Sequence, residues 1–214
     1  MIVVISGAPG AGKGTQGDLI ASRCGFRKIS TGDALRNQVK LGTDVGKKAE
    51  AIMAQGKLVP DDVLFEILKK ELGSSRSEKI LLDGYPRNVA QAQTLETLKD
   101  IHPVVSVLHL EVPREDLVQR LSGRRVCSQC GATYHVSTRP TKRDGVCDAC
   151  GGKVEQRPDD QPQKVAVRLD VYGTSTEPVF DYYRNRSLYR KLDGSRDAET
   201  VYQALKGALA TVSA

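Results

Sequence analysis

The 214-residue sequence lacks the features that direct a protein into or across a membrane. It contains no apolar run that approaches the roughly 20 residues needed to span a bilayer. Its apolar start, Ile2 to Ile5, is too short for the hydrophobic region of a signal peptide. We therefore expect a cytoplasmic protein without a membrane partner.

Long basic runs are also absent, although the chain carries 32 lysines and arginines against 26 aspartates and glutamates, a net charge of +6. The largest basic cluster, Lys142-Arg143 with Arg139 nearby, is small. Many arginines stand instead beside glycine, aspartate or aromatic residues in short motifs. This distribution favours a phosphate-rich small ligand over nucleic acid or an anionic membrane.

The length and the patterning indicate one α/β domain with insertions rather than two independent domains. Buried strands are predicted at Ile2–Ile5, from Lys79 to Asp83 and at Val104–Glu111, and a last short strand is predicted near residues 189–192. Asp61 and Asp62 are expected to cap one helix. Asp197 is expected to cap the last helix, whose apolar stripe comprises Val201, Ala204, Leu205, Ala208, Leu209 and Val212.

The glycine-rich segment Gly7–Thr15 follows the first predicted strand and leads into a helix. Its glycines permit positive φ and a close approach of the backbone to a ligand, so that successive N–H groups converge on an anion. Lys13 adds a positive charge for the β- and γ-phosphates of a nucleoside triphosphate. The lysine, the strand and the helix together disfavour the alternative, a glycine-rich turn that binds nothing.

A second motif, Asp83-Gly84-Tyr85-Pro86-Arg87, follows the buried strand that starts at Lys79. Ligands of open α/β sheets lie at the carboxyl ends of the strands, so we expect Asp83 near the phosphates and any Mg²⁺. In the alternative interpretation Asp83 forms a turn and Arg87 is solvated. A phosphate-binding loop in the same chain disfavours that alternative.

Four of the five cysteines form two Cys-x2-Cys pairs, Cys127/Cys130 and Cys147/Cys150, with sixteen residues between the pairs. This spacing falls within the four-thiolate zinc pattern, and a glycine follows each pair, as a metal knuckle requires. Four protein ligands complete a coordination sphere, so we expect structural Zn²⁺, with iron as an alternative occupant. Unligated thiols are a further alternative, and disulfides are disfavoured in a reducing cytoplasm.

Together these motifs resemble the nucleoside monophosphate kinases and, within them, the adenylate kinases that carry a long zinc-binding lid. The form Gly-x-Pro-Gly-x-Gly-Lys-Gly-Thr is closer to this family than to GTPases or motor ATPases, because a glycine separates the lysine from the Thr15 hydroxyl. Tyr85 stands where phenylalanine is common. The resemblance spans essentially the whole chain, although Pro162 and Gln163 replace acidic residues often found there.

The resemblance assigns roles residue by residue. The residues implied to contact AMP are Thr31, Arg36, Lys57, Leu58, Val59, Gly84, Tyr85, Pro86, Arg87, Gln91, Arg157 and Arg168. The residues implied to contact ATP are Gly10, Ala11, Gly12, Lys13, Gly14, Thr15, Arg120, Arg124, Thr133, Tyr134 and Arg196. The residues implied in catalysis are Lys13, Asp83, Arg87, Arg124, Arg157 and Arg168. For Tyr134, hydrophobic packing is an equally favoured interpretation, and Asp83 would orient Mg²⁺ through water.

The implied fold is a three-layer P-loop α/β fold around a central parallel five-stranded sheet. Its core would comprise residues 1–29, 60–122 and 161–214, with an AMP-binding insertion at 30–59 and a zinc-binding lid at 123–160. Both insertions would close over the core and exclude water. Zinc would rigidify the lid, since about forty residues cannot build a sufficient core alone.

The implied activity is reversible phosphoryl transfer from MgATP to AMP, giving two ADP, by a monomer. One alternative is another nucleotide kinase, a UMP/CMP kinase or a GTP:AMP phosphotransferase, which Thr31, Gln91 and the long lid disfavour. The other is a zinc-ribbon nucleic-acid binder with a regulatory NTPase. It leaves the Asp83 to Arg87 motif and the arginines around the lid unused.

Overall fold

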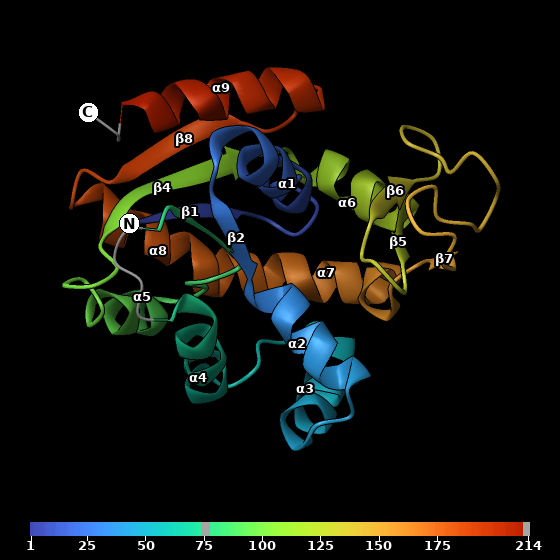
Figure 1. Cartoon of the computed structure of the whole chain (residues 1–214), viewed down its shortest axis with the longest axis horizontal. Coiled ribbons are helices and arrows are strands. Elements are labelled where there is room, and N and C mark those ends of the chain that lie inside the picture. The colour runs from blue at the N-terminus through green and yellow to red at the C-terminus, as the bar shows by residue number, and fades with distance from the viewer. Residues whose placement is uncertain (74–77, 212–214) are drawn as a thin grey trace.

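The computed structural model describes residues 1–73 and 78–211. Its centre is a parallel five-stranded sheet with the strand order β2-β3-β1-β4-β8 (Figure 1). The strands are β1 (Ile2–Gly7), β2 (Arg27–Ser30), β3 (Ile80–Asp83), β4 (Val104–Glu111) and β8 (Tyr189–Asp193). The expected five-stranded sheet is thus confirmed. The hydrophobic pattern does not locate β2, because this short edge strand buries one residue, Ile29.

Alternate residues of β1 point into two hydrophobic cores, one on each face of the sheet. Val3 and Ile5 lie in the first core, while Ile2 and Val4 lie in the second. The helices that contribute to the first core are α1 (Lys13–Cys24), α6 (Arg114–Gly123), α7 (Pro162–Val171) and α9 (Ala198–Ala210). Those of the second are α4 (Asp61–Leu72), α5 (Val89–Glu96) and α8 (Glu177–Arg184), together with α2 (Thr31–Lys40) through Leu35 and α3 (Asp44–Ala54) through Ala49. The expected three-layer arrangement follows (Figure 1).

Two segments extend from these layers (Figure 1). The first contains α2 (Thr31–Lys40) and α3 (Asp44–Ala54), which approach so closely that a Cβ atom on Gly46 would lie 2.1 Å from the Gln38 carbonyl oxygen. The second contains a three-stranded antiparallel sheet of order β6-β5-β7. Its elements are β5 (Arg124–Cys127), β6 (Thr133–His135), β7 (Val154–Glu155) and the 3₁₀ turn η1 (Pro158–Asp160). The helices α2 and α3 lie within residues 30–59, and the elements of the three-stranded sheet and η1 lie within residues 123–160.

Capping side chains set several helix boundaries. Asp197 caps α9, as predicted, by accepting hydrogen bonds from two backbone N–H groups of the first turn. The apolar stripe of that helix is buried at Val201, Leu205 and Leu209, whereas Val212 lies outside the described residues. The predicted cap at Asp61 is wrong: Pro60 occupies the N-cap of α4. None of the described helices has the length and hydrophobicity needed to cross a bilayer.

Candidate functional site

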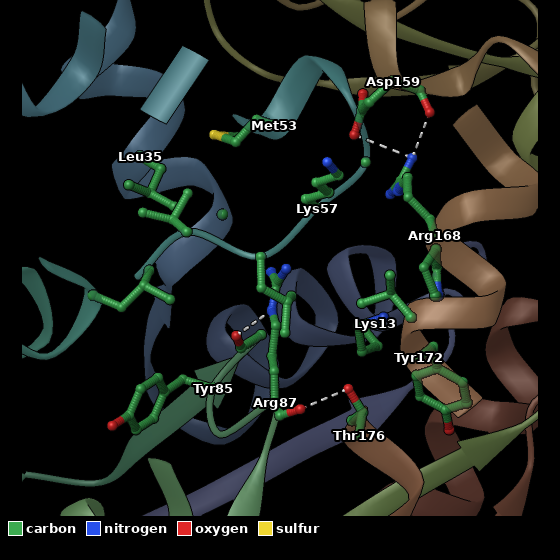
Figure 2. Close-up of a pocket in the computed structure, with 18 of the residues that line it drawn as sticks. Lys13, Leu35, Met53, Lys57, Tyr85, Arg87, Asp159, Arg168, Tyr172 and Thr176 are labelled. Carbon is green, nitrogen blue, oxygen red and sulfur yellow. Dashed lines mark hydrogen bonds and ion pairs between the residues drawn. The ribbon is translucent and has the colours of Figure 1, made fainter. Parts of the chain in front are cut away.

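A cavity opens where β1 and β3 end, between the α2–α3 segment and α7 (Figure 2). Figure 2 shows Leu35, Met53 and Lys57 on one side of it and Arg168 and Tyr172 on the other. Six basic side chains line the cavity against one acidic side chain, Asp159. The basic residues are Lys13, Arg36, Lys57, Arg87, Arg157 and Arg168. Such an excess of positive charge on the lining attracts an anionic ligand.

The loop after β1 forms one wall of this cavity. Gly10 and Gly12 have φ angles of 88° and 93°, a conformation that favours glycine. Gly12 is the N-cap of α1, so this helix begins at Lys13, within the glycine-rich segment. Gly14 and Thr15 lie in its first turn. The loop and helix therefore have the arrangement of an anion site.

Lys13 is held at this loop by backbone oxygens. Its Nζ donates to the carbonyls of Gly7 at 2.8 Å and Ala8 at 2.9 Å. Burial, reinforced by the neighbouring guanidinium groups and opposed by the Asp83 carboxylate, lowers the pKa of Lys13 to about 8. A phosphate beside Lys13 would raise this pKa again, because it favours the charged form.

Arg87, in the loop after β3, is held by three hydrogen bonds to different parts of the chain. The Arg87 Nε donates to the Gly84 carbonyl at 2.7 Å, and the Arg87 backbone N–H donates to the Gln91 Oε1 at 2.7 Å. The Thr176 hydroxyl donates to the Arg87 carbonyl at 2.9 Å (Figure 2). Burial lowers the pKa of Arg87, and nearby arginines add to this effect. The guanidinium is thus preorganised and electrostatically strained without an anion.

Two residues assigned to AMP, Thr31 and Gln91, are buried behind this loop and do not line the cavity. The Thr31 hydroxyl donates to the Gly84 carbonyl at 2.8 Å. The Gln91 Nε2 donates to the Asp61 Oδ1 at 2.6 Å. The sequence motifs did not identify Asp61 as the hydrogen-bond partner of Gln91. Asp61 follows Pro60, and this pattern predicts a residue at the start of a helix.

Two acids at the end of the lid hold three of the predicted arginines. Asp160 is fully buried and accepts from Arg124 at 2.5 and 2.8 Å and from Arg168 at 2.8 Å. Asp159 pairs with Arg157 at 3.0 Å. It also pairs with Arg168 at 3.1 Å (Figure 2). Burial would raise the pKa of Asp159, but the arginines outweigh it and hold that pKa below its usual value. In the sequence, only their position two and three residues after Arg157 points to these acids.

The remaining residues predicted for the acceptor side and Asp83 lie in or near the cavity as follows. Arg36 forms an ion pair with Asp33, and burial together with Arg157 lowers the pKa of Arg36. Asp83 lies at the end of β3, as predicted, and is buried. Lys57, Leu58, Val59, Tyr85 and Pro86 line the cavity. The acceptor-side predictions therefore converge on one place, apart from the two buried residues.

Among the predicted donor-side residues, Lys13 lines this cavity, whereas the other predicted residues of the phosphate loop and those outside it do not. Arg124 lies next to the cavity, because it shares Asp160 with Arg168. Arg120 donates to the carbonyls of Gly194 at 2.9 Å and Ser195 at 2.8 Å, so it shapes the loop before α9. Arg196 is exposed and pairs with Asp193 at 3.1 Å. Thr133 is exposed on β6, whereas its neighbour Tyr134 is buried.

The four lid cysteines come together as the spacing predicts. Their Sγ atoms all lie within 4.8 Å of one another, with Cys127 to Cys150 at 3.5 Å and Cys130 to Cys147 at 3.6 Å. A tetrahedron with Zn–S bonds of about 2.3 Å has S–S edges of about 3.8 Å. All four are free thiols. The donor set and its spacing therefore fit a structural zinc ion.

Comparison with known proteins gives a consistent result. The family model described as adenylate kinase matches residues 5–188. The chain is 47% identical over 210 residues to the adenylate kinase of Caldicellulosiruptor saccharolyticus, covering 96% of this chain and 98% of that protein. It is 47% identical over 213 residues to the adenylate kinase of Methanosarcina mazei, covering 98% and 99%. The adenylate kinase of Carboxydothermus hydrogenoformans is 45% identical over 212 residues, with 98% and 99% covered. This chain belongs to the adenylate kinase family, whose members are nucleoside monophosphate kinases.

Proposed function

We propose that the protein transfers the γ-phosphoryl group of MgATP to AMP, reversibly, giving two ADP. The observation that carries this proposal is the cavity at the ends of β1 and β3, where six cations face one acid. Two polyphosphate chains meeting there would supply the missing negative charge. Family membership makes ATP, AMP and ADP the expected nucleotides.

In this proposal the phosphate loop holds the donor. The backbone N–H groups of residues 10–15 and the N-terminus of α1 would bind the β- and γ-phosphates. Lys13 would exchange its bonds to the Gly7 and Ala8 carbonyls for the phosphate oxygens. Arg120 would support this side by fixing the loop before α9.

The acceptor phosphate would lie between Arg36 and Arg87, because both line the cavity from opposite segments. The adenine would rest against the apolar exit of the α2–α3 segment, Leu58 and Val59. The buried amide of Gln91 reaches the base only after it releases Asp61. A monomer suffices for this arrangement, since one chain provides both sides of the cavity.

Catalysis would come from charge neutralisation and positioning, without a covalent intermediate. Arg124, Arg157 and Arg168 are paired with Asp159 and Asp160 in this structure. When two nucleotides bind, these arginines would turn to the transferring phosphoryl group. The acids thus hold the guanidinium groups near the cavity until the substrates arrive.

The residues around the loop also fit Mg²⁺, which prefers oxygen ligands. The Asp83 carboxylate lies at the end of β3 and acts electrostatically on both Lys13 and Arg87. The Thr15 hydroxyl lies in the first turn of α1. Asp83 through water and Thr15 directly would hold the ion, which would neutralise phosphate charge when bound.

The test is a panel of nucleotide pairs followed by phosphorus NMR. ATP with AMP should yield ADP at a rate at least about tenfold above ATP with UMP or CMP and above GTP with AMP. ATP alone should be hydrolysed far more slowly than it is transferred, because the closed site excludes water. A faster rate with UMP, CMP or GTP would change the substrate assignment. ATP consumption that does not depend on any monophosphate would overturn the proposal.

A further inference from the structure

Tyr134 is the most deeply buried of the three lid residues that are predicted to contact ATP, Arg124, Thr133 and Tyr134. Its side chain is 6% exposed and belongs to a small core with Cys127 and Cys147. The guanidinium carbon of Arg139 lies 5.7 Å from the centre of its ring. Neither a face of the ring nor the hydroxyl is therefore presented to a nucleotide base in this structure.

The hydrogen bonds of the Tyr134 hydroxyl show which partner receives its proton. The backbone N–H of Asp148 donates to the Tyr134 Oη at 2.8 Å, so this oxygen acts as an acceptor there. The Cys147 Sγ lies 3.3 Å from the same oxygen. Because a phenol has one proton and the first bond does not use it, that proton is available to the sulfur.

We propose that Tyr134 is a positioning residue of the zinc site: its hydroxyl holds the Cys147 thiolate and fixes the turn from Cys147 to Cys150. The proposal rests on the lid binding a metal through the four cysteines. Four thiolates around Zn²⁺ leave a net charge of −2 on the site. Hydrogen-bond donors to the sulfur atoms reduce the free-energy cost of burying this charge. Removal of such a supporting contact typically lowers metal affinity about 10- to 100-fold.

Tyr134→Phe removes the hydroxyl and keeps the ring. We expect it to bind zinc at least about tenfold more weakly in competition with a chromogenic chelator, with the full-length protein. The matched control is Ser128→Ala, which removes the hydrogen bond from Ser128 Oγ to the Lys153 carbonyl at 3.2 Å in the same part of the lid. This control touches no sulfur and should stay within about threefold of the parent protein.

Cobalt substitution separates a contact to sulfur from general support of the lid. A hydrogen bond stabilises the sulfur lone pairs, so its loss should move the thiolate-to-cobalt charge-transfer band of Tyr134→Phe to lower energy. Ser128→Ala should leave the band in place. Weaker metal binding with an unmoved band would overturn the proposal, because it would reduce Tyr134 to a packing residue.

The third measurement is the KM for ATP of the zinc-loaded protein, which should stay within about threefold in Tyr134→Phe. An increase of tenfold or more, with metal affinity and band unchanged, would place Tyr134 at the donor base instead. A lid that binds neither zinc nor cobalt would also overturn the proposal. The metal readouts need no turnover, so they stand even if the proposed kinase reaction fails.

Discussion

Lys13 and Arg87 face the cavity without a carboxylate partner within ion-pair distance among the described residues. Both are bonded instead to backbone carbonyls, Lys13 to Gly7 and Ala8 and Arg87 to Gly84. Carbonyl oxygens offset less of a buried charge than a carboxylate does. These two side chains therefore gain the most from a bound phosphate, and they carry the sharpest predictions at the scale of single residues.

The pH dependence of nucleotide binding should follow Lys13. Burial lowers the pKa of free Lys13 to about 8, whereas bound phosphates favour the charged form and raise it. Above about pH 8 the free lysine has lost its proton and the bound lysine keeps it, so binding takes up a proton and weakens as the pH rises. Calorimetry of ATP binding at about pH 9 in buffers of different ionisation enthalpy should detect this uptake. Lys13→Met should abolish the uptake, and equal uptake in this variant would contradict the assignment.

Substitution of Arg87 should affect the acceptor. Arg87→Ala should lower kcat/KM for AMP at least about 100-fold, since it removes a charge-assisted contact to phosphate. Steady-state kinetics with varied AMP measure this loss. Arg190→Ala is the control, because Arg190 is exposed on the edge strand β8, and it should retain parental kinetics. Unchanged kinetics in Arg87→Ala would remove this residue from the proposed site.

At the scale of residues, the sequence predicts which basic side chains face the cavity. It does not predict which acidic side chains pair with the residues around it. Lys13 and Arg87 belong to contiguous motifs whose backbone geometry is local, so their placement at the cavity follows from the chain itself. Asp160 and Asp61 act on residues from other elements, and only the folded chain selects those pairs. Tyr134 shows the same limit, because its pattern allowed both packing and a base contact.

At the scale of elements, hydrophobic runs predicted β1, β3 and β4, and a last short strand was expected where β8 lies. The strand β2 was not predicted, because it is short and buries one residue. The lid has a different physical basis. Its core contains three buried side chains, Cys127, Tyr134 and Cys147, and its two outer strands have three and two residues. So small a core cannot hold the segment in one conformation without further support.

The metal should therefore stabilise the lid more than it affects chemistry. Cys130→Ser removes one of four ligands and should lower the melting temperature, while turnover at low temperature falls less. Elemental analysis of the reduced parent protein should give one zinc per chain. Calorimetric melting and activity at low temperature complete the measurement, with Ser128→Ala as the lid control. A loss of activity larger than the loss of stability would indicate a catalytic metal instead.

For the whole molecule, the cavity depends on contacts between segments that lie far apart in the sequence. The α2–α3 segment approaches α7 so closely that a Cβ atom on Gly56 would lie 2.9 Å from the Arg168 Cγ. The π-helical turn η2 (Tyr172–Thr176) then connects α7 to α8 and holds the Arg87 carbonyl through Thr176. The family resemblance implied which segments meet, but the contacts that join them required the structure.

This arrangement predicts that one chain holds two nucleotides at once. The phosphate loop would bind one, and the surface formed by Arg36, Arg87 and the α2–α3 segment would bind the other. A compound that links two adenosines through five phosphates should bind one per chain and at least about 100-fold more tightly than ATP or AMP, because its second half binds intramolecularly. At about 1,000 times its Kd it should stabilise the fold by about 4 kcal/mol.

Titration calorimetry measures the stoichiometry and affinity, and thermal melting measures the stabilisation. A single adenosine with five phosphates is the matched control, because it carries the same number of phosphates and at least as much negative charge without the second adenosine. If charge alone drives binding, the control should bind as tightly as the linked compound, and the two-nucleotide arrangement would be wrong. If two linked molecules bind per chain independently, the two surfaces do not face a common cavity. Tight binding of one linked molecule, weakened in Arg87→Ala, is the result that the six converging cations predict.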